Sequence, residues 1–432
     1  MRYYSTKNKD QFYSLEESVL KGLPDDNGLF MPEHFPALAA DFWSNLSKLS
    51  FQEIAFEISK VFLYPELSEK AIKTLVEEAI SFDAPLVQLE KNLHVLELFH
   101  GPTLAFKDFG ARFMAGLMRY FLRNSSSKLT ILVATSGDTG SAVASGFYKV
   151  EGVEVIILYP SGKVSDLQEK QLTTLGENIT ALEIQGSFDD CQRLVKEAFL
   201  DQDLLAKYRL SSANSINIAR LIPQSLYYAN ALAQLHEHPD KAVFVVPSGN
   251  FGNLTAGLFA KKLGMPVKDF VAATNVNASV PQYLESGIFK PHASFQTLSN
   301  AMDVGNPSNF ARMLDLCNND HSAMKKDLRA FSFDDEETVL AMQEIYSRYN
   351  YVMDPHGAIA YLGWKKYNSS SKVGVGILLE TAHPAKFIET VEKNLKIKLE
   401  IPAQLQEVAQ KAKQSKVLNS DYDNFKNYLL QR

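Results

Sequence analysis

The chain has 432 residues, of which 44 are Lys or Arg and 50 are Asp or Glu, so its formal net charge is −6. At roughly 150 residues per domain, this length predicts about three domains, each with a core of its own. A charged fraction of 22% and an aromatic fraction of 11% exclude global disorder. The mild acidity argues against a nucleic-acid partner, because such proteins concentrate basic residues on one surface.

The two cysteines, Cys191 and Cys317, are too few and too far apart for a disulfide framework or a four-thiolate metal site. We expect no metal and a reducing, cytoplasmic location. The first ten residues lack the apolar segment of a secretory signal, and no apolar run approaches the ~18 residues of a membrane-spanning helix. We therefore expect a soluble protein without a membrane partner, and leave open whether it is a monomer or a homodimer.

The first ninety or so residues predict helices and loops rather than an alternation of strands and helices. A helix is predicted over Ser68–Ile80, with Ser68 as its N-cap, and Gly22–Pro32 is dense in turn-forming residues. We interpret residues 1–95 as an appended N-terminal domain.

From Lys128 onward, short β-rich runs alternate with amphipathic stretches, which is typical of a parallel sheet covered by crossover helices. The predicted strands are Leu129–Ala134, Val153–Tyr159 and Ile179–Ile184. The predicted helices are Ser141–Tyr148, Ser165–Leu175 and Phe188–Leu200. Ser165 is suited to cap the second helix and Ser187 the third. This block predicts a smaller, mobile lobe over residues 128–215.

A second block of the same kind begins at Lys241. Its predicted elements are the strands Ala242–Val246, Phe270–Thr274 and Val373–Glu380, a helix over Leu254–Leu263, and a helix that opens with Pro384. The fold class is therefore α/β, with two open α/β/α lobes and the N-terminal domain. The larger lobe is expected to comprise residues 96–127 and 216–432.

Three loops each follow the carboxyl end of a predicted strand, namely Thr135–Gly140, Ser248–Asn253 and Glu380–Pro384. Open α/β sheets place their ligands at such ends, and backbone N–H groups at a helix N-terminus stabilise anions there. None of the three loops has the spacing of a P-loop or of a dinucleotide-binding loop. Together they favour small phosphorylated ligands.

Lys107 is the candidate nucleophile, because it lies between Phe106 and Phe109. A lysine in apolar surroundings has a lowered pKa and can form a Schiff base. The alternative is a solvent-exposed ion pair between Lys107 and the neighbouring Asp108, and the residue pattern alone favours that alternative.

Four segments together resemble the threonine synthase family, whose members are fold-type II pyridoxal-phosphate enzymes similar to the β subunit of tryptophan synthase. The segments are Leu98–Asp108, Thr135–Gly140, Ser248–Asn253 and Thr381–Phe387. Near the N-terminus, Tyr4–Thr6 and Gly22–Pro32 also resemble the long bacterial and fungal form, so the resemblance covers nearly the whole chain. One departure is Asn27, where the family pattern has Gly.

The resemblance implies that Lys107 holds pyridoxal 5′-phosphate through a Schiff base and is the catalytic base. It also implies cofactor contacts from Asp138, near the 3′ oxygen, from Thr381, at the pyridine nitrogen, and from the loop residues Gly249, Asn250, Phe251, Gly252 and Asn253. A neutral hydroxyl cannot hold the pyridine nitrogen protonated as a carboxylate does. The resulting milder electron sink suits elimination and replacement better than transamination.

The implied activity is that of a carbon–oxygen lyase acting on phosphates. O-phospho-L-homoserine and water would give L-threonine and phosphate, the last step of threonine biosynthesis. A second anion site is then required, and the segment Asn214–Arg220 resembles the family's substrate-phosphate segment. The implied substrate contacts are Ser215, Asn217 and Arg220 for the phosphate, and Ser136, Gly137 and Thr139 for the carboxylate.

Structural roles are the alternative for several of these residues. Asn214–Arg220 could be a loop with a helix N-cap, and Thr381 could cap the helix that follows Pro384. The three histidines that invite a catalytic role are interpreted as hydrogen-bonded structural residues, because Lys107 already supplies the base. They are His100, His356 and His383, and the possible exception is His100, which is close to Lys107 in sequence.

Two other functions stay open. A serine or threonine dehydratase of the same fold would share Lys107 and the glycine-rich loop, but its hydroxyl leaving group would not need the second anion site. A non-catalytic protein that binds phosphorylated small molecules would not need a buried amine.

Overall fold

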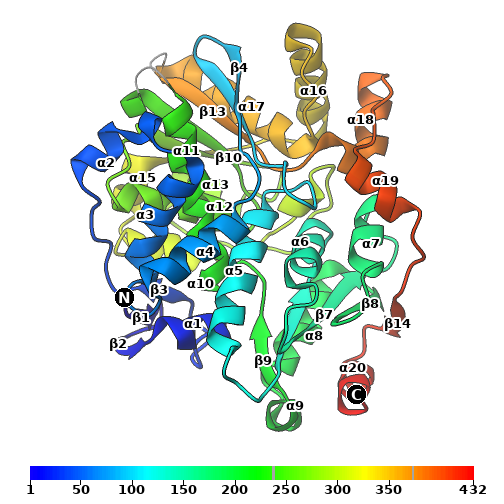
Figure 1. Ribbon diagram of the computed structural model, residues 1–432. Coiled ribbons are helices and arrows are strands. Elements are labelled where there is room, and N and C mark those ends of the chain that lie inside the picture. The colour runs from blue at the N-terminus through cyan, green and yellow to red at the C-terminus, as the bar shows by residue number, and fades with distance from the viewer. Residues whose placement is uncertain (236–238, 372–373) are drawn as a thin grey trace.

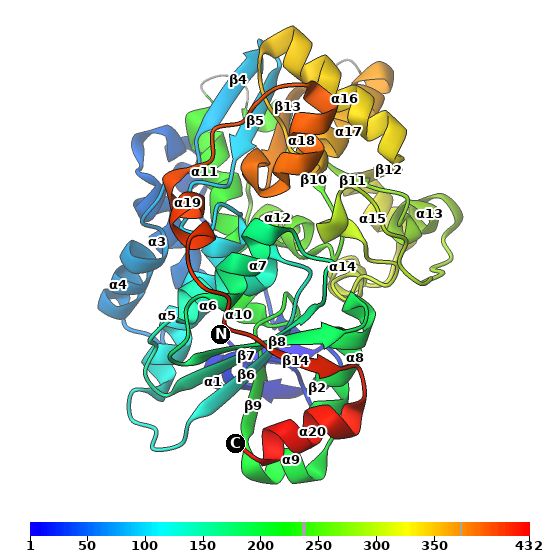
Figure 2. The same ribbon diagram turned by 90° about the vertical axis from the view of Figure 1, so that its right-hand side faces the viewer.

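Three β-sheets organise the chain in the computed structural model, which describes residues 1–235, 239–371 and 374–432 (Figure 1). A three-stranded antiparallel sheet lies near the N-terminus, and two larger sheets of six and five strands each have helices packed on them (Figures 1 and 2). All strand pairs of the two larger sheets are parallel except β4 with β5. The predicted α/β class with two lobes and an N-terminal addition is confirmed.

The N-terminal region combines the sheet β2-β1-β3 with helices that pack against the larger lobe. Its elements are β1 (Tyr3–Ser5), β2 (Asn8–Tyr13), α1 (Leu15–Lys21), β3 (Phe30–Pro32), α2 (Ala40–Ser44), η1 (Leu46–Lys48), α3 (Phe51–Leu63) and α4 (Glu69–Ala79). Ser68 accepts a hydrogen bond from the Ala71 N–H, so the predicted cap of α4 is confirmed.

The smaller lobe is built on the sheet β14-β8-β7-β6-β9. Its elements are β6 (Leu129–Ala134), α6 (Asp138–Phe147), β7 (Val153–Pro160), α7 (Asp166–Thr173), β8 (Ile179–Gln185), α8 (Phe188–Ala198), α9 (Gln202–Lys207) and β9 (Arg209–Ser212). The predicted caps Ser165 and Ser187 are confirmed. Helix α6 begins three residues before the predicted start, because Gly137, with φ 138°, lets the chain turn directly from the loop into the helix.

Two C-terminal elements also belong to the smaller lobe. Strand β14 (Lys416–Asn419) lies beside β8 (Figure 2) and pairs with it. Helix α20 (Tyr422–Leu430) places Phe425 and Leu429 in the lobe's hydrophobic core. The predicted boundaries place all of residues 216–432 in the larger lobe. That assignment is wrong for these elements, because a mostly exposed four-residue strand carries too little apolar signal to indicate which sheet edge it joins.

The larger lobe is built on the sheet β12-β11-β10-β13-β5-β4. Its strands are β4 (Leu86–Glu90), β5 (Leu93–Glu97), β10 (Ala242–Pro247), β11 (Asp269–Thr274), β12 (Leu328–Ser332) and β13 (Val375–Glu380). The predicted boundary placed residues 86–95 in the appended N-terminal domain. That placement is wrong, because β4 and β5 belong to the sheet of the larger lobe. Strand β13 begins two residues after the predicted Val373, which lies outside the described residues.

The remaining helices accompany this sheet or connect it to the smaller lobe. They are α5 (Lys107–Leu122), α10 (Ile218–Leu221), η2 (Ile222–Ser225), α11 (Leu226–Gln234), η3 (Pro239–Lys241), α12 (Gly252–Lys262), α13 (Ser279–Ser286), η4 (Asn300–Met302), α14 (Phe310–Leu316), α15 (His321–Asp327), α16 (Asp335–Tyr349), α17 (Pro355–Ser371), η5 (Pro384–Phe387), α18 (Ile388–Leu395) and α19 (Ala403–Ala409). Helix α5 contacts α6 of the smaller lobe as well as α4 and α10, so Lys107, its first residue, lies where the lobes meet. Across residues 1–235, 239–371 and 374–432, no helix is long and apolar enough to cross a membrane.

Candidate active site

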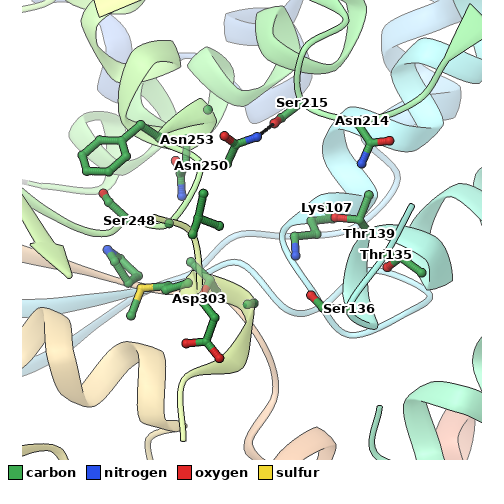
Figure 3. A pocket seen from close by; sticks show the side chains of 18 of the residues that line it. Lys107, Thr135, Ser136, Thr139, Asn214, Ser215, Ser248, Asn250, Asn253 and Asp303 are labelled. Carbon is green, nitrogen blue, oxygen red and sulfur yellow. Dashed lines mark hydrogen bonds between the residues drawn. The ribbon is translucent and has the colours of Figure 1, made fainter. Parts of the chain in front are cut away.

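A pocket of about 130 Å³ lies between the two lobes (Figure 3). All three predicted loops contribute to it, because they follow the carboxyl ends of β6, β10 and β13. Of the residues selected from the sequence, those that line the pocket are Lys107, Ser136, Thr139, Ser215, Arg220, Gly249, Asn250, Phe251, Gly252, Asn253 and Thr381.

The side chain of Lys107 points into this pocket (Figure 3). Burial lowers the pKa of Lys107 to about 8; the carboxylate of Asp138 opposes that shift, while the cations Arg220 and Lys386 add to it. No hydrogen bond or salt bridge involves the Lys107 amine within the described parts of the chain. A buried amine that is partly neutral near pH 8 is suited to act as a nucleophile and a base.

Asp108 does not form the surface ion pair that was the alternative for Lys107. Its carboxylate is fully buried and accepts hydrogen bonds from the Thr103 N–H (2.8 Å) and hydroxyl (2.7 Å). Phe109 packs into the hydrophobic core, and the aromatic neighbour of Lys107 is Phe106, whose ring centroid lies 5.8 Å from Nζ. The alternative is therefore wrong, because the carboxylate next in sequence turns to Thr103.

Backbone hydrogen bonds hold the loop before Lys107 against the end of β13. The Phe106 N–H donates to the Thr381 carbonyl (2.9 Å), and the His383 N–H donates to the Leu104 carbonyl (3.0 Å). Leu104 has a φ of 57°, which is costly for a residue with a side chain and marks a constrained turn. These contacts fix Thr381 and Lys107 relative to each other across the pocket.

The glycine-rich loop Gly249–Asn253 is shaped to bring backbone N–H groups together at the start of α12. A Cβ on Gly249 would lie 2.6 Å from the Met302 Cα and 2.9 Å from the Ala301 carbonyl oxygen, so no other residue fits there without moving the backbone. Phe251 has a φ of 57°, and α12 begins at the next residue. The loop therefore offers an anion a helix N-terminus and converging amides.

Asn253 adds a side-chain donor whose orientation is fixed. The hydroxyls of Tyr227 and Tyr228 lie 2.5 and 2.6 Å from its Oδ1 and donate to it, so the amide Nδ2 must face the other way. That Nδ2 is buried and has no hydrogen-bond partner among the described residues, although Asn253 lines the pocket. An unpaired buried donor is costly, and a phosphate oxygen is the kind of partner it lacks. The residues present thus fit a phosphate group at this loop.

Asp138 lies beside the pocket without lining it. Its Oδ1 accepts hydrogen bonds from the Gln168 Nε2 (2.7 Å) and from the Lys386 Nζ (2.8 Å). Burial alone would raise the pKa of Asp138, but the cations Lys386 and Lys107 outweigh it and hold that pKa well below its usual range. Lys386 is fully buried and was part of the motif Thr381–Phe387, yet the sequence suggested no role for it.

The segment Asn214–Arg220 supplies two groups to the pocket. The Ser215 hydroxyl oxygen accepts a hydrogen bond from Asn250 Nδ2 (2.7 Å), as Figure 3 shows. It also accepts one from Asn309 Nδ2 (3.2 Å), which leaves its own hydrogen free to donate. Arg220 is buried, donates from Nη1 to the Ala213 carbonyl (2.6 Å), and has an Nε without a partner among the described residues. Burial lowers the pKa of Arg220 to about 10.

Asn217 and Gly137 do not line the pocket. The Asn217 Nδ2 donates to two backbone carbonyls, including that of Ser212 (3.0 Å), and its Oδ1 caps α10 by accepting from the Ala219 N–H (3.0 Å). The expected contact between Asn217 and the substrate phosphate is therefore wrong, because both polar atoms of this side chain already form hydrogen bonds with backbone groups. A Cβ on Gly137 would lie 2.7 Å from Gln168, so this glycine serves the close packing of α7.

Two of the three histidines have hydrogen-bond partners outside the pocket. His100 contacts the Glu97 carboxylate (2.7 Å), His383 caps η5 through its Nδ1, and neither lines the pocket. His356 does line it: its Nδ1 lies 3.0 Å from Asp354 Oδ1, and its Nε2 is buried without a partner among the described residues.

Some residues that line the pocket, such as Asp303, belong to none of the motifs selected from the sequence. Asp303, whose pKa burial raises to about 6, comes from an irregular segment that carries no recognisable motif.

The class of the protein is defined by two features: a lysine at the junction of two α/β lobes, and a glycine-rich loop in the same pocket that fits a phosphate group. The family model for pyridoxal-phosphate-dependent enzymes matches residues 81–379, which is more than half of the chain. The protein is a pyridoxal-phosphate-dependent lyase of fold type II. Further models, described as the N-terminus and the C-terminal part of threonine synthase, match residues 2–80 and 358–429.

Full-length relatives identify the family. The chain is 46% identical to the threonine synthase of Haemophilus influenzae over 431 residues, with both chains completely covered. A crystal structure of threonine synthase from Escherichia coli superposes with a TM-score of 0.94 at 43% identity, covering all of both chains. A structure of pyridoxal-phosphate-bound threonine synthase from Brucella melitensis gives 0.92 at 34% identity, covering 100% of this chain and 99% of the other. The chain belongs to the threonine synthase family.

The dehydratase alternative is only a distant match. A solved threonine deaminase aligns at 16% identity over 72% of this chain with a TM-score of 0.54, which shows the shared fold alone. The cofactor of the family is pyridoxal 5′-phosphate, in agreement with the expectation from the sequence.

Proposed function

We propose that the protein converts O-phospho-L-homoserine and water into L-threonine and phosphate. The observation that carries the proposal is that one pocket contains a buried amine, Lys107, and two adjacent groups of anion-binding donors. One group is the loop Gly249–Asn253, and the other is formed by Ser215 and Arg220. A cofactor phosphate needs one such site, and a substrate with a phosphate leaving group needs the other.

Lys107 would hold pyridoxal phosphate covalently through Nζ, with the loop amides of Gly249–Asn253 and the unpaired Asn253 Nδ2 binding the cofactor's phosphate. The hydroxyl of Thr381 would face its pyridine nitrogen. Asp138 does not line the pocket, so we assign it a role through its negative charge beside Lys107 in place of a direct contact. When bound, the cofactor supplies an electron sink that makes the C–H bonds near the substrate's amino group acidic.

The chain's own residues would bind the substrate and move its protons. Ser136 and Thr139, at the N-terminus of α6, would hold the carboxylate, while Arg220 and Ser215 hold the phosphate on Cγ. The Lys107 amine, freed from the cofactor when the substrate binds, would take the proton from Cα and return protons to the carbons beyond it. In balance, Cγ exchanges its phosphate for a hydrogen, and Cβ exchanges a hydrogen for the hydroxyl of water.

The test is to supply O-phospho-L-homoserine to the holoenzyme and to measure threonine and phosphate together. Equal amounts of the two products are expected. Phosphate without threonine would indicate an eliminating enzyme that releases a keto acid, and no phosphate release would refute the proposed substrate. Replacement of Lys107 by Ala should abolish both products.

We also propose a cytoplasmic location, which is supported by the free thiols of Cys191 and Cys317.

A further inference from the structure

Arg312, in α14, is completely buried and gives all of its hydrogen bonds to uncharged acceptors. Its Nε donates to the Phe30 carbonyl (3.1 Å), its Nη1 to the Ser215 carbonyl (3.1 Å) and Asn309 Oδ1 (2.7 Å), and its Nη2 to the Ile216 carbonyl (2.6 Å). No carboxylate forms an ion pair with it in the described parts of the chain. A buried cation without a counter-ion is costly, so its presence calls for an explanation.

The guanidinium of Arg312 sets the direction of the peptide groups next to Ser215. In a planar trans peptide the N–H points opposite to the C=O, so the Ile216 N–H points away from the Arg312 that binds the Ser215 carbonyl. No hydrogen bond from the Ile216 N–H is found among the described residues. Arg312 itself does not line the pocket, whereas Ser215 does. The cation therefore acts on the pocket through this loop.

Arg312 also fixes the amide of Asn309. Because Oδ1 of Asn309 accepts from Arg312, its Nδ2 must face the other way, and there it donates to the Ser215 hydroxyl oxygen (3.2 Å) and to the Asn250 carbonyl (3.1 Å). Ser215 belongs to the proposed substrate-phosphate site and Asn250 to the cofactor-phosphate loop. One buried cation thus aligns both anion-binding loops.

We propose that Arg312 is a positioning residue that makes the pocket selective for a substrate carrying a dianionic phosphate. It holds the donors of the Ser215 loop in place and supplies positive charge that the bound phosphate balances. This inference rests on the proposed function, which assigns Ser215 and Arg220 to the substrate's phosphate, and it adds a residue that positions that site. The test uses the holoenzyme, so that the cofactor's phosphate is present in every measurement. Differences between ligands then report on the second anion site alone.

The test compares a ligand that has the phosphate with one that lacks it. On holoenzyme variants, calorimetry would measure the dissociation constants of inorganic phosphate and of L-norvaline, an amino acid without a phosphate. Arg312→Lys cannot keep the forked contacts, so phosphate affinity should fall about tenfold and norvaline affinity should stay within about twofold. The KM for O-phospho-L-homoserine should rise with the phosphate dissociation constant, and kcat should change less.

Two variants of Asn309 separate charge from hydrogen bonding and remain informative if Arg312→Lys does not fold. Asn309→Leu removes the donors to Ser215 and Asn250. Asn309→Asp removes the same donors and also places a carboxylate against Arg312, which neutralises its charge. We expect Asn309→Asp to weaken phosphate binding about tenfold more than Asn309→Leu.

Arg112→Lys is the matched control, because Arg112 also donates to backbone carbonyls, those of Glu78 and Ala79, but joins α5 to the N-terminal region. It should leave both dissociation constants unchanged. Equal losses for phosphate and norvaline in Arg312→Lys, or equal phosphate affinities in the two Asn309 variants, would overturn the inference. Selective loss of phosphate binding in an enzyme that makes no threonine from O-phospho-L-homoserine would refute the proposed function and uphold the inference.

Discussion

Replacing Lys386 by Met should destabilise the protein strongly, because it leaves the Asp138 carboxylate buried without its main partner. The Lys386 Nζ lies 2.8 Å from Asp138 Oδ1 and also donates to the Thr103 carbonyl (2.7 Å). Both charged side chains are almost completely buried. Removing one member of such a pair costs roughly 3–5 kcal/mol in the free energy of unfolding, because the other charge stays desolvated.

The loss should depend on pH in a defined direction. The pKa of Asp138 is held well below its unfolded value of about 3.9, so the pair stabilises the wild type above that value and loses its effect as the pH falls through the folded pKa. In Lys386→Met the main lowering influence is gone and burial favours the protonated carboxyl. The gap between variant and wild type should therefore be largest near pH 7 and narrow as the pH falls.

Urea unfolding at a fixed cofactor concentration would measure the effect at several pH values. Adding Asp138→Asn to Lys386→Met should recover most of the loss, since the double variant no longer contains the carboxylate that the loss of Lys386 leaves buried and unpaired. Lys413→Met is the matched control: Lys413 pairs with Glu169 and Glu183, but its side chain is 34% exposed, so about 1 kcal/mol or less is expected. A loss below about 1 kcal/mol for Lys386→Met at pH 7, or a loss that grows toward low pH, would refute the reasoning.

Three further outcomes follow from the pocket. Arg220→Ala should raise the KM for O-phospho-L-homoserine about 10- to 100-fold in steady-state kinetics and affect any reaction with serine far less. An equal fall in kcat/KM for the two substrates would mean that the segment is structural. Asn253→Leu should weaken binding of pyridoxal phosphate about tenfold in a visible-absorbance titration, because the buried donor is lost. In the cofactor-free protein, Lys107 should lose its proton as the pH rises through about 8, so peptide mapping should find its acylation half-maximal near that pH; a midpoint near 10.5 would contradict the lowered pKa.

Local rules made much of the site predictable from the sequence. Strands, helix caps and glycine loops depend on residues close together in the chain, so Ser68, Ser165 and Ser187 were located correctly. The loop at Gly249 was found because only glycine tolerates the backbone beside it.

Contacts between distant segments were not predictable in the same way. Asparagine is a residue type that can donate a hydrogen bond to phosphate, so the sequence allowed that role for Asn217. Only the folded structure shows that its side-chain amide is already hydrogen-bonded to backbone groups. Arg312 carries no local signal, because its backbone acceptors Phe30, Ser215 and Ile216 lie far from it in the chain. Asp303 accepts hydrogen bonds from the nearby Thr297 and from the distant Asn275, and no sequence motif links these residues. The pairing of Lys386 with Asp138 likewise joins the two lobes and leaves no trace in either motif alone.

The position of β14 and α20 affects the order in which the protein folds during synthesis. The strands β6 to β9 leave the ribosome about midway through translation, yet their hydrophobic core also contains Phe425 and Leu429. Until residues 416–430 follow, the edge of β8 is unpaired and part of that core is exposed to water. The smaller lobe therefore cannot complete its hydrophobic core before a segment that follows the whole of the larger lobe in the chain has been made.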